Sequence, residues 1–132
     1  MIQPSLLLRR AFLIDAIVSG MMAVLLTLAA SALAPLFNLP EALLRETGLF
    51  LIAYTALVGW LATRQSMPKA LVIIVIAGNA AWTIASIALL FSSVVTPNLL
   101  GQIFVAGQAI VPGAIAELQY IGLRRSGATL AV

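Results

Sequence analysis

Six polar side chains interrupt stretches of sequence that are otherwise apolar, and chemistry is most plausible at these positions. They are Asp15, Asn79, Gln102, Gln108, Glu117 and Gln119. A carboxylate in such a setting can hold a proton or a cation, whereas an amide can only donate and accept hydrogen bonds. Because an unpaired polar group is costly in an apolar medium, each of these side chains requires either a structural partner or a ligand.

The two carboxylates lie at similar distances from arginines at their own ends of the apolar stretches. In a helix, Glu117 is ~10 Å from Arg124 and Asp15 is ~7–8 Å from Arg10 along the axis. The two acids either face one another across a bundle or lie apart around it. Each is structural if it pairs with the arginines at its own helix end. Without such a partner, Glu117 is a candidate proton or cation site.

Asn79 is expected near the centre of its span, because it lies ~15 Å beyond Lys69 in a helix. Its small neighbours, Gly78 among them, would let another helix approach closely. The amide then either bonds across helices, contributing roughly 0.6–2 kcal/mol, or contacts a substrate or ion.

The last apolar stretch carries polar residues on two helical lines, and we expect neither line to face lipid. They are Gln102 with Glu117, and Gln108 with Gln119. Pro112, followed by Gly113, cannot donate to the carbonyl of Gln108, so a kink is expected there. The carbonyl then needs another partner, which predicts that this helix is enclosed by its neighbours.

The elements that must position these residues are helices that cross a membrane. The chain has 132 residues, of which 63% are apolar and 8% charged, and its mean hydropathy is +1.16. Each of four apolar stretches approaches the roughly 20 residues that a spanning helix needs. They cover about 11–34, 46–63, 69–91 and 98–122. We predict an all-α fold, a single polytopic domain over 1–132 with four transmembrane helices in a compact bundle. Residues 40–46 are expected to form separate interfacial turns.

Basic residues predict the orientation. Six of the seven fall on one side of a four-span arrangement, and Arg45 alone falls on the other. Since basic residues accumulate on the cytoplasmic side, both termini are expected in the cytoplasm. Small residues at helical spacing, Ala16 and Gly20 first, predict a helix contact face, either within the chain or with another subunit.

Several function classes are disfavoured by composition. The chain has no cysteine and no histidine, which removes the commonest thiolate, haem and zinc ligands. It carries no nucleophile and base pair and no Gly-rich phosphate loop, so we expect no enzyme, no cofactor and no metal. Basic residues occur in runs of at most two and without interleaved aromatics, which argues against nucleic acid.

The C-terminal half resembles a group of short bacterial four-span membrane proteins of uncharacterised function. The resemblance lies in GNAAWTIASIALL and PNLLGQIFVAGQAIVPGAIAELQYIGLRR, and it implies a multi-pass protein of the bacterial inner membrane. The architecture alone is similar to that of small multidrug resistance transporters, whose essential acid lies in the first span. That position corresponds to Asp15, but LLRRAFLIDAIVSG departs from their pattern and Glu117 has no counterpart there.

Two function hypotheses follow. The favoured one is a structural or accessory subunit that packs against a larger membrane complex or against copies of itself, with lipids and other membrane subunits as partners. The alternative is a small proton- or cation-coupled transporter or channel using Glu117. Its candidate site residues are Glu117, Asp15, Asn79, Gln108 and Gln102, and the candidate packing residues are Ala16, Gly20, Gly78, Pro112 and Gly113.

Overall fold

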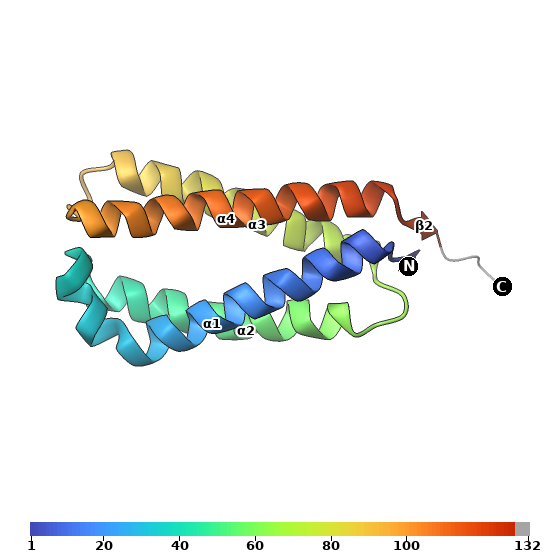
Figure 1. The fold of residues 1–132 in the computed structure, drawn as a ribbon, viewed down its shortest axis with the longest axis horizontal. Helices are drawn as coiled ribbons and strands as arrows, with labels where there is room; N and C mark the ends of the chain where they lie inside the picture. The colour runs from blue at the N-terminus through green and yellow to red at the C-terminus, as the bar shows by residue number, and fades with distance from the viewer. Residues whose placement is uncertain (129–132) are drawn as a thin grey trace.

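Two antiparallel helical hairpins make up the structure, a computed structural model that describes residues 1–128 (Figure 1). The helices are α1 (Leu6–Phe37), α2 (Glu41–Ala62), α3 (Lys69–Phe91) and α4 (Leu99–Arg124). They run alternately up and down, so the N-terminus, the α2–α3 loop and the end of α4 lie at one end of the bundle. The predicted all-α fold of four helices is confirmed.

The outer surface is apolar along the length of the bundle. Side chains such as Leu28 and Phe91 are exposed, and each of the four helices is long and apolar enough to cross a membrane. Inside, two hydrophobic clusters lie towards opposite ends. One surrounds Phe12 and Met67, and the other surrounds Leu26 and Phe37.

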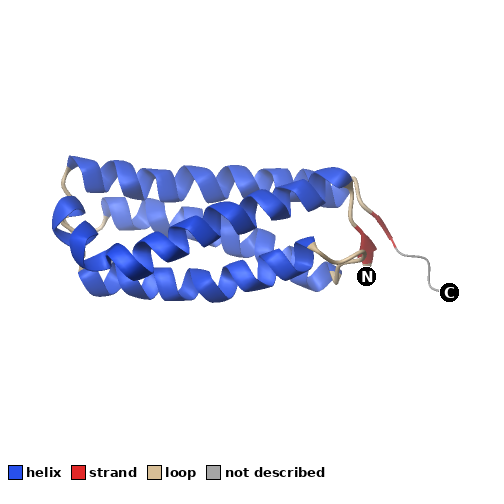
Figure 2. Cartoon of the chain, turned by 60° about the horizontal axis from the view of Figure 1, so that its bottom comes forward, coloured by secondary structure: helices blue, strands red, loops and turns tan. Residues whose placement is uncertain are grey.

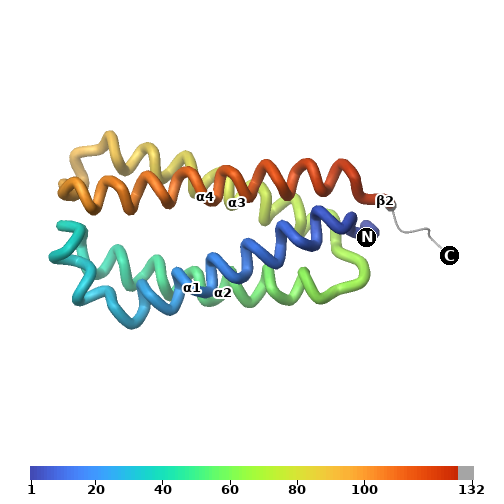
Figure 3. Tube along the Cα trace, in the orientation of Figure 1, coloured from blue at the N-terminus to red at the C-terminus, as the bar shows by residue number. Residues whose placement is uncertain are grey.

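The α1–α2 hairpin is held by two reciprocal contacts between glycine and threonine. A Cβ atom added at Gly20 of α1 would lie 3.3 Å from Cγ2 of Thr55 on α2. A Cβ atom at Gly48 of α2 would lie 2.6 Å from both the backbone nitrogen and Oγ1 of Thr27 on α1. Helices α1 and α2 run antiparallel (Figure 3). In each helix the threonine is the seventh residue after the glycine, so each glycine meets the threonine of the other helix.

Helix α1 is tied to α4 at both ends. At the end that carries the N-terminus, Oγ of Ser5 donates to the carbonyl of Gly122 at 2.7 Å. At the opposite end, Nδ2 of Asn98 donates to the carbonyl of Leu36 at 2.8 Å, and its backbone N–H donates to Phe37 at 3.1 Å. These bonds close the two hairpins into one bundle.

A short two-stranded sheet covers the end where the chain begins (Figure 2). Strand β1 (Ile2–Gln3) pairs antiparallel with β2 (Gly127–Ala128). Ile2 also exchanges backbone hydrogen bonds with Met67 in the α2–α3 loop, at 2.8 and 2.9 Å. The sequence analysis did not anticipate this pairing, because two-residue strands carry no periodic signal.

Helix α1 extends past residue 34, near which the first predicted span ends. It continues through Pro35 to Phe37. Proline removes one intrahelical hydrogen bond, but its fixed φ angle is already that of a helix. The turn comes at Asn38, which adopts the left-handed conformation with φ 53°. Pro40 then precedes the first residue of α2, so residues 41–46 belong to that helix rather than to separate interfacial turns.

The candidate packing residues divide into two groups. Ala16 and Gly20 face α2, and Gly113 of α4 lies where an added Cβ would be 3.1 Å from Oγ1 of Thr83 on α3. Gly78 differs, because an added Cβ would meet no atom within 4 Å. No helix of the described chain packs against Gly78, so close approach by a helix of another subunit stays a prediction.

The glycine–threonine contacts predict a sharp difference between two glycine substitutions. Gly48→Ala should destabilise the fold by about 1–3 kcal/mol, because the new methyl group would overlap the backbone of α1. Gly107→Ala is the matched control, since nothing lies within 4 Å of that position and alanine favours the helix. Thermal unfolding of both variants in one detergent measures the difference, and equal midpoints would contradict the packing described.

Candidate functional site

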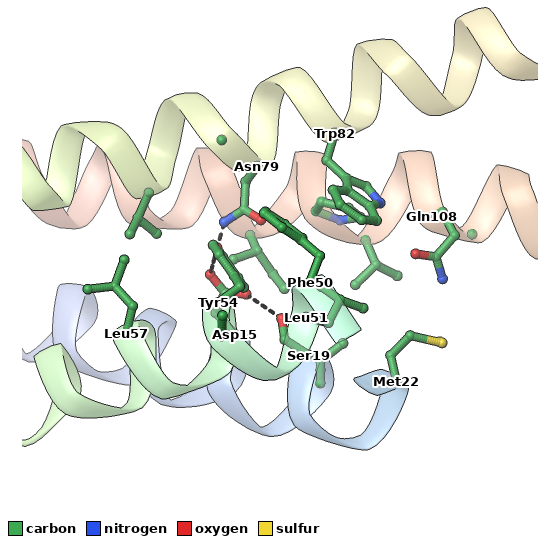
Figure 4. Close-up of a pocket in the computed structure, with 18 of the residues that line it drawn as sticks. Asp15, Ser19, Met22, Phe50, Leu51, Tyr54, Leu57, Asn79, Trp82 and Gln108 are labelled. Carbon is green, nitrogen blue, oxygen red and sulfur yellow. Dashed lines mark hydrogen bonds between the residues drawn. The ribbon is translucent and has the colours of Figure 1, made fainter. Parts of the chain in front are cut away.

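One polar side chain from each helix meets in a buried cluster around Asp15 (Figure 4). Its carboxylate oxygen Oδ2 accepts hydrogen bonds from Oη of Tyr54 at 2.7 Å, Nδ2 of Asn79 at 2.9 Å and Nε2 of Gln119 at 2.8 Å. Nδ2 of Asn79 also donates to Oε1 of Gln119 at 3.0 Å. The network therefore links α1, α2, α3 and α4 through a single acceptor.

No cation neutralises this carboxylate among the described residues. Asp15 is 1% exposed, and its other oxygen, Oδ1, accepts only from Ser19 at 3.0 Å. The expected pairing with an arginine at the start of the helix is absent. Arg9 instead donates to the backbone carbonyls of Ala62 and Arg64 and so joins the ends of α1 and α2. A buried acid that is satisfied by neutral donors alone retains its capacity for a proton or a cation.

A large cavity adjoins the cluster. It measures about 590 Å³ and is lined by residues from all four helices. Its polar wall consists of Asp15, Ser19, Tyr54 and Asn79, whereas most of the remaining lining is apolar. Several residues that line the cavity are exposed although they lie in the middle of helices. Phe50 of α2 is one, and others lie on α1, α3 and α4. The cavity therefore opens sideways, between helices.

Aromatic rings form one side of the cavity. Phe50 stacks on Trp82 with ring centroids 5.8 Å apart, and on Tyr54 at 6.4 Å. The three rings connect α2 with α3 beside the Asp15 cluster. Electron-rich ring faces next to a carboxylate attract a cation that carries apolar groups.

The other candidate residues of α4 fall in different places. Gln108 lines the cavity and forms no hydrogen bond with the described residues. Gln102 is exposed and donates to the carbonyl of Pro97 at 3.3 Å. Glu117 is exposed on the outer face of α4, with no hydrogen bond or ion pair among residues 1–128. Asp15 and Glu117 therefore do not meet.

The expectation for the line of Gln102 and Glu117 is corrected, since this line faces outwards. Helix α4 contacts α1 and α3 with the opposite side, where Gln119 is fully buried. Pro112 lines the cavity. Beside it, Oγ1 of Thr83 donates to the carbonyl of Ala109 at 2.7 Å, one residue beyond the carbonyl that the sequence indicated. A hydroxyl of a neighbouring helix thus satisfies the backbone close to the proline.

Two members of the cluster escaped the sequence analysis as site residues. Gln119 was placed on a helical line with Gln108 but was not assigned to the site, and Tyr54 was hidden in an apolar run. Ser19 lies four residues after Asp15, which is the spacing that brings side chains together on a helix face. No group of three or more His, Cys, Asp or Glu within the described chain is arranged to hold a metal ion.

The shared carboxylate predicts that Asn79 stabilises the bundle. Asn79→Leu should lower the free energy of unfolding by about 0.6–2 kcal/mol, because two interhelical hydrogen bonds are lost. Gln102→Leu is the control, as this amide is exposed and bonds only within its own helix end. Unfolding by denaturant in detergent would measure both variants. An unfolding midpoint of Asn79→Leu equal to that of wild type would show that Asn79 does not stabilise the bundle.

Comparisons with known protein families, with curated proteins and with solved structures find no match for this chain. The resemblance of the C-terminal half to short four-span membrane proteins stays a prediction. The architectural similarity to small multidrug resistance transporters also stays a prediction. Function is therefore inferred below from the geometry around Asp15.

Proposed function

We propose that this chain is a four-span protein of the bacterial inner membrane that binds an organic cation with an apolar body at Asp15, as the binding step of a small transporter. Both termini lie in the cytoplasm in this proposal. The basic residues support that orientation, since the helix ends that carry six of the seven lie at one end of the bundle.

The observation that carries the proposal is a buried carboxylate without a cation at the wall of an apolar cavity. Three neutral donors hold Oδ2 of Asp15, while Oδ1 accepts from Ser19 alone and has a lone pair left for a ligand. The charge is thereby positioned without being neutralised. A cationic group of a ligand would complete the electrostatics of the site.

The lining of the cavity favours an organic cation over an inorganic one. A metal or alkali ion must exchange its water for several oxygen ligands, and the cavity offers few beside its long apolar lining. An ammonium group with apolar substituents loses less hydration and gains contact with Phe50, Tyr54 and Trp82. The sideways opening also suits a molecule that dissolves in the bilayer and enters from it.

Asp15→Asn should weaken binding of an alkyltrimethylammonium roughly 10- to 100-fold, because the amide keeps the shape of the carboxylate but removes its charge. Glu117→Gln makes the same chemical change on the outer face and should leave binding intact. Trp82 reports occupancy directly, since it lines the cavity and a Trp60→Phe background makes it the single tryptophan. Fluorescence titration in lipid nanodiscs gives the affinities, and an unaltered Asp15→Asn affinity would refute the assignment.

A second candidate function, the accessory subunit, is favoured by one observation. Glu117 lies on the outer face of α4 with no partner in the described chain, and a carboxylate that faces lipid is costly. A basic side chain on a membrane helix of another protein would remove that cost.

Glu117→Gln should release such a partner. Gentle extraction of the tagged chain, followed by mass spectrometry, should then recover a stoichiometric membrane protein with wild type and lose it with the variant. Glu46→Gln is the matched control, since it makes the same chemical change at an exposed carboxylate of α2. Recovery of the chain alone, in both forms, would count against an accessory role.

A further inference from the structure

A second polar layer lies on the same helix faces as the Asp15 cluster, closer to the end that carries the α1–α2 and α3–α4 loops. It consists of Thr47 on α2, Ser86 on α3 and Gln108 on α4. These three residues line a second cavity of about 270 Å³. Trp82, Phe104 and Gln108 line both cavities, so the two spaces adjoin.

The spacing in the sequence relates the second polar layer to the first. Thr47 is seven residues before Tyr54, and Ser86 is seven residues after Asn79. Seven residues turn a helix by about 700°, within ~20° of two full turns, and advance it by ~10 Å. On α4, Gln108 lies eleven residues before Gln119, which is within ~20° of three turns. Each of these helices therefore repeats a polar side chain on one face.

Helix α1 does not repeat its acceptor. Eleven residues beyond Asp15, on nearly the same line, stands Leu26, which lines the second cavity. In the first layer the carboxylate of Asp15 gathers the donors of three other helices. In the second layer α2, α3 and α4 again carry groups that can donate, and α1 supplies no carboxylate to gather them.

The polar groups of this layer form no hydrogen bonds within the described chain. Ser86 is only 8% exposed, yet its hydroxyl has no protein partner, and the same holds for the side chains of Thr47 and Gln108. A buried hydroxyl that is left unpaired costs about 1–3 kcal/mol. Ser86 is buried, and the half-buried Thr47 and Gln108 line the same cavity, so all three polar groups are available there to a ligand.

We propose that the second polar layer binds an uncharged hydrogen-bond acceptor, such as a carbonyl or ether oxygen, carried by the same ligand whose cation lies at Asp15. This inference rests on the proposed function. Two points then define the ligand class: a cationic head at Asp15 and an acceptor ~10 Å away, since the two layers are seven residues apart on α2 and α3. The apolar walls between the layers accommodate an alkyl linker. The lining of the second cavity contains no Lys or Arg that would balance an anionic acceptor, so the acceptor is neutral.

Two probes of equal length test this arrangement. One is an alkyltrimethylammonium, and the other carries a ketone ~10 Å from the nitrogen, as the helical rise between the layers requires. The ketone probe should bind wild type more tightly than the alkyl probe, after each affinity is corrected for partition into protein-free nanodiscs. Ser86→Ala and Thr47→Val should each weaken the ketone probe roughly threefold to tenfold, as expected for one hydrogen bond. Neither substitution should change the affinity of the alkyl probe.

Ser31→Ala removes an exposed hydroxyl from the outer surface of α1 and is the control. Equal affinities of the two probes for wild type would overturn the second subsite, and would indicate that water alone occupies that cavity. The proposed function would stand in that case, provided that Asp15→Asn still weakens both probes. If Asp15→Asn weakens neither probe while Ser86→Ala still acts on the ketone, the second subsite stands and the cation site fails.

Discussion

The fold depends on one acceptor that all four helices share. The carboxylate of Asp15 is the single point at which side chains from α2, α3 and α4 converge on α1. In a membrane, lipid would compete with protein for the apolar contacts between helices, because aliphatic side chains and acyl chains are equally apolar. Directional hydrogen bonds to a common anion have no such competitor. They therefore determine which helix faces lie inside.

The same hydrogen bonds explain why the site can both hold the helices together and bind a ligand. Neutral donors satisfy the geometry of the carboxylate without cancelling its charge, so the bundle can be held together before any ligand arrives. Had Arg9 reached Asp15, the network would have been electrically complete and closed to cations. Arg9 instead donates to the carbonyls of Ala62 and Arg64 and leaves Asp15 without a cationic partner in the described chain. The adjoining cavity is apolar for the most part, which preserves the strength of that charge.

Hydropathy alone predicted the number of helices, because each span is far longer than any ambiguity in its boundaries. The depths of Asp15, Asn79 and Glu117 in a membrane, which rest on the helical rise, stay predictions. The direction in which each side chain faces could not be predicted, because the hydrophobic periodicity of a helix is weak when nearly every position is apolar. Glu117 was therefore expected inside and lies outside, while Tyr54 was overlooked. The pairing of Asn79 with Asp15, 64 residues away in the chain, is a tertiary contact that no local pattern encodes.

The reciprocal contacts of Gly20 with Thr55 and of Gly48 with Thr27 act as a ruler between α1 and α2. Two antiparallel helices that touch at one point can slide, whereas two identical contacts seven residues apart must be made or broken together. A slip by one turn would break both contacts at once. The hairpin thus has one permitted register, and that register places Tyr54 level with Asp15. Glycines and threonines that do not themselves line the first cavity thus determine where along the bundle the hydroxyl of Tyr54 meets the carboxylate of Asp15.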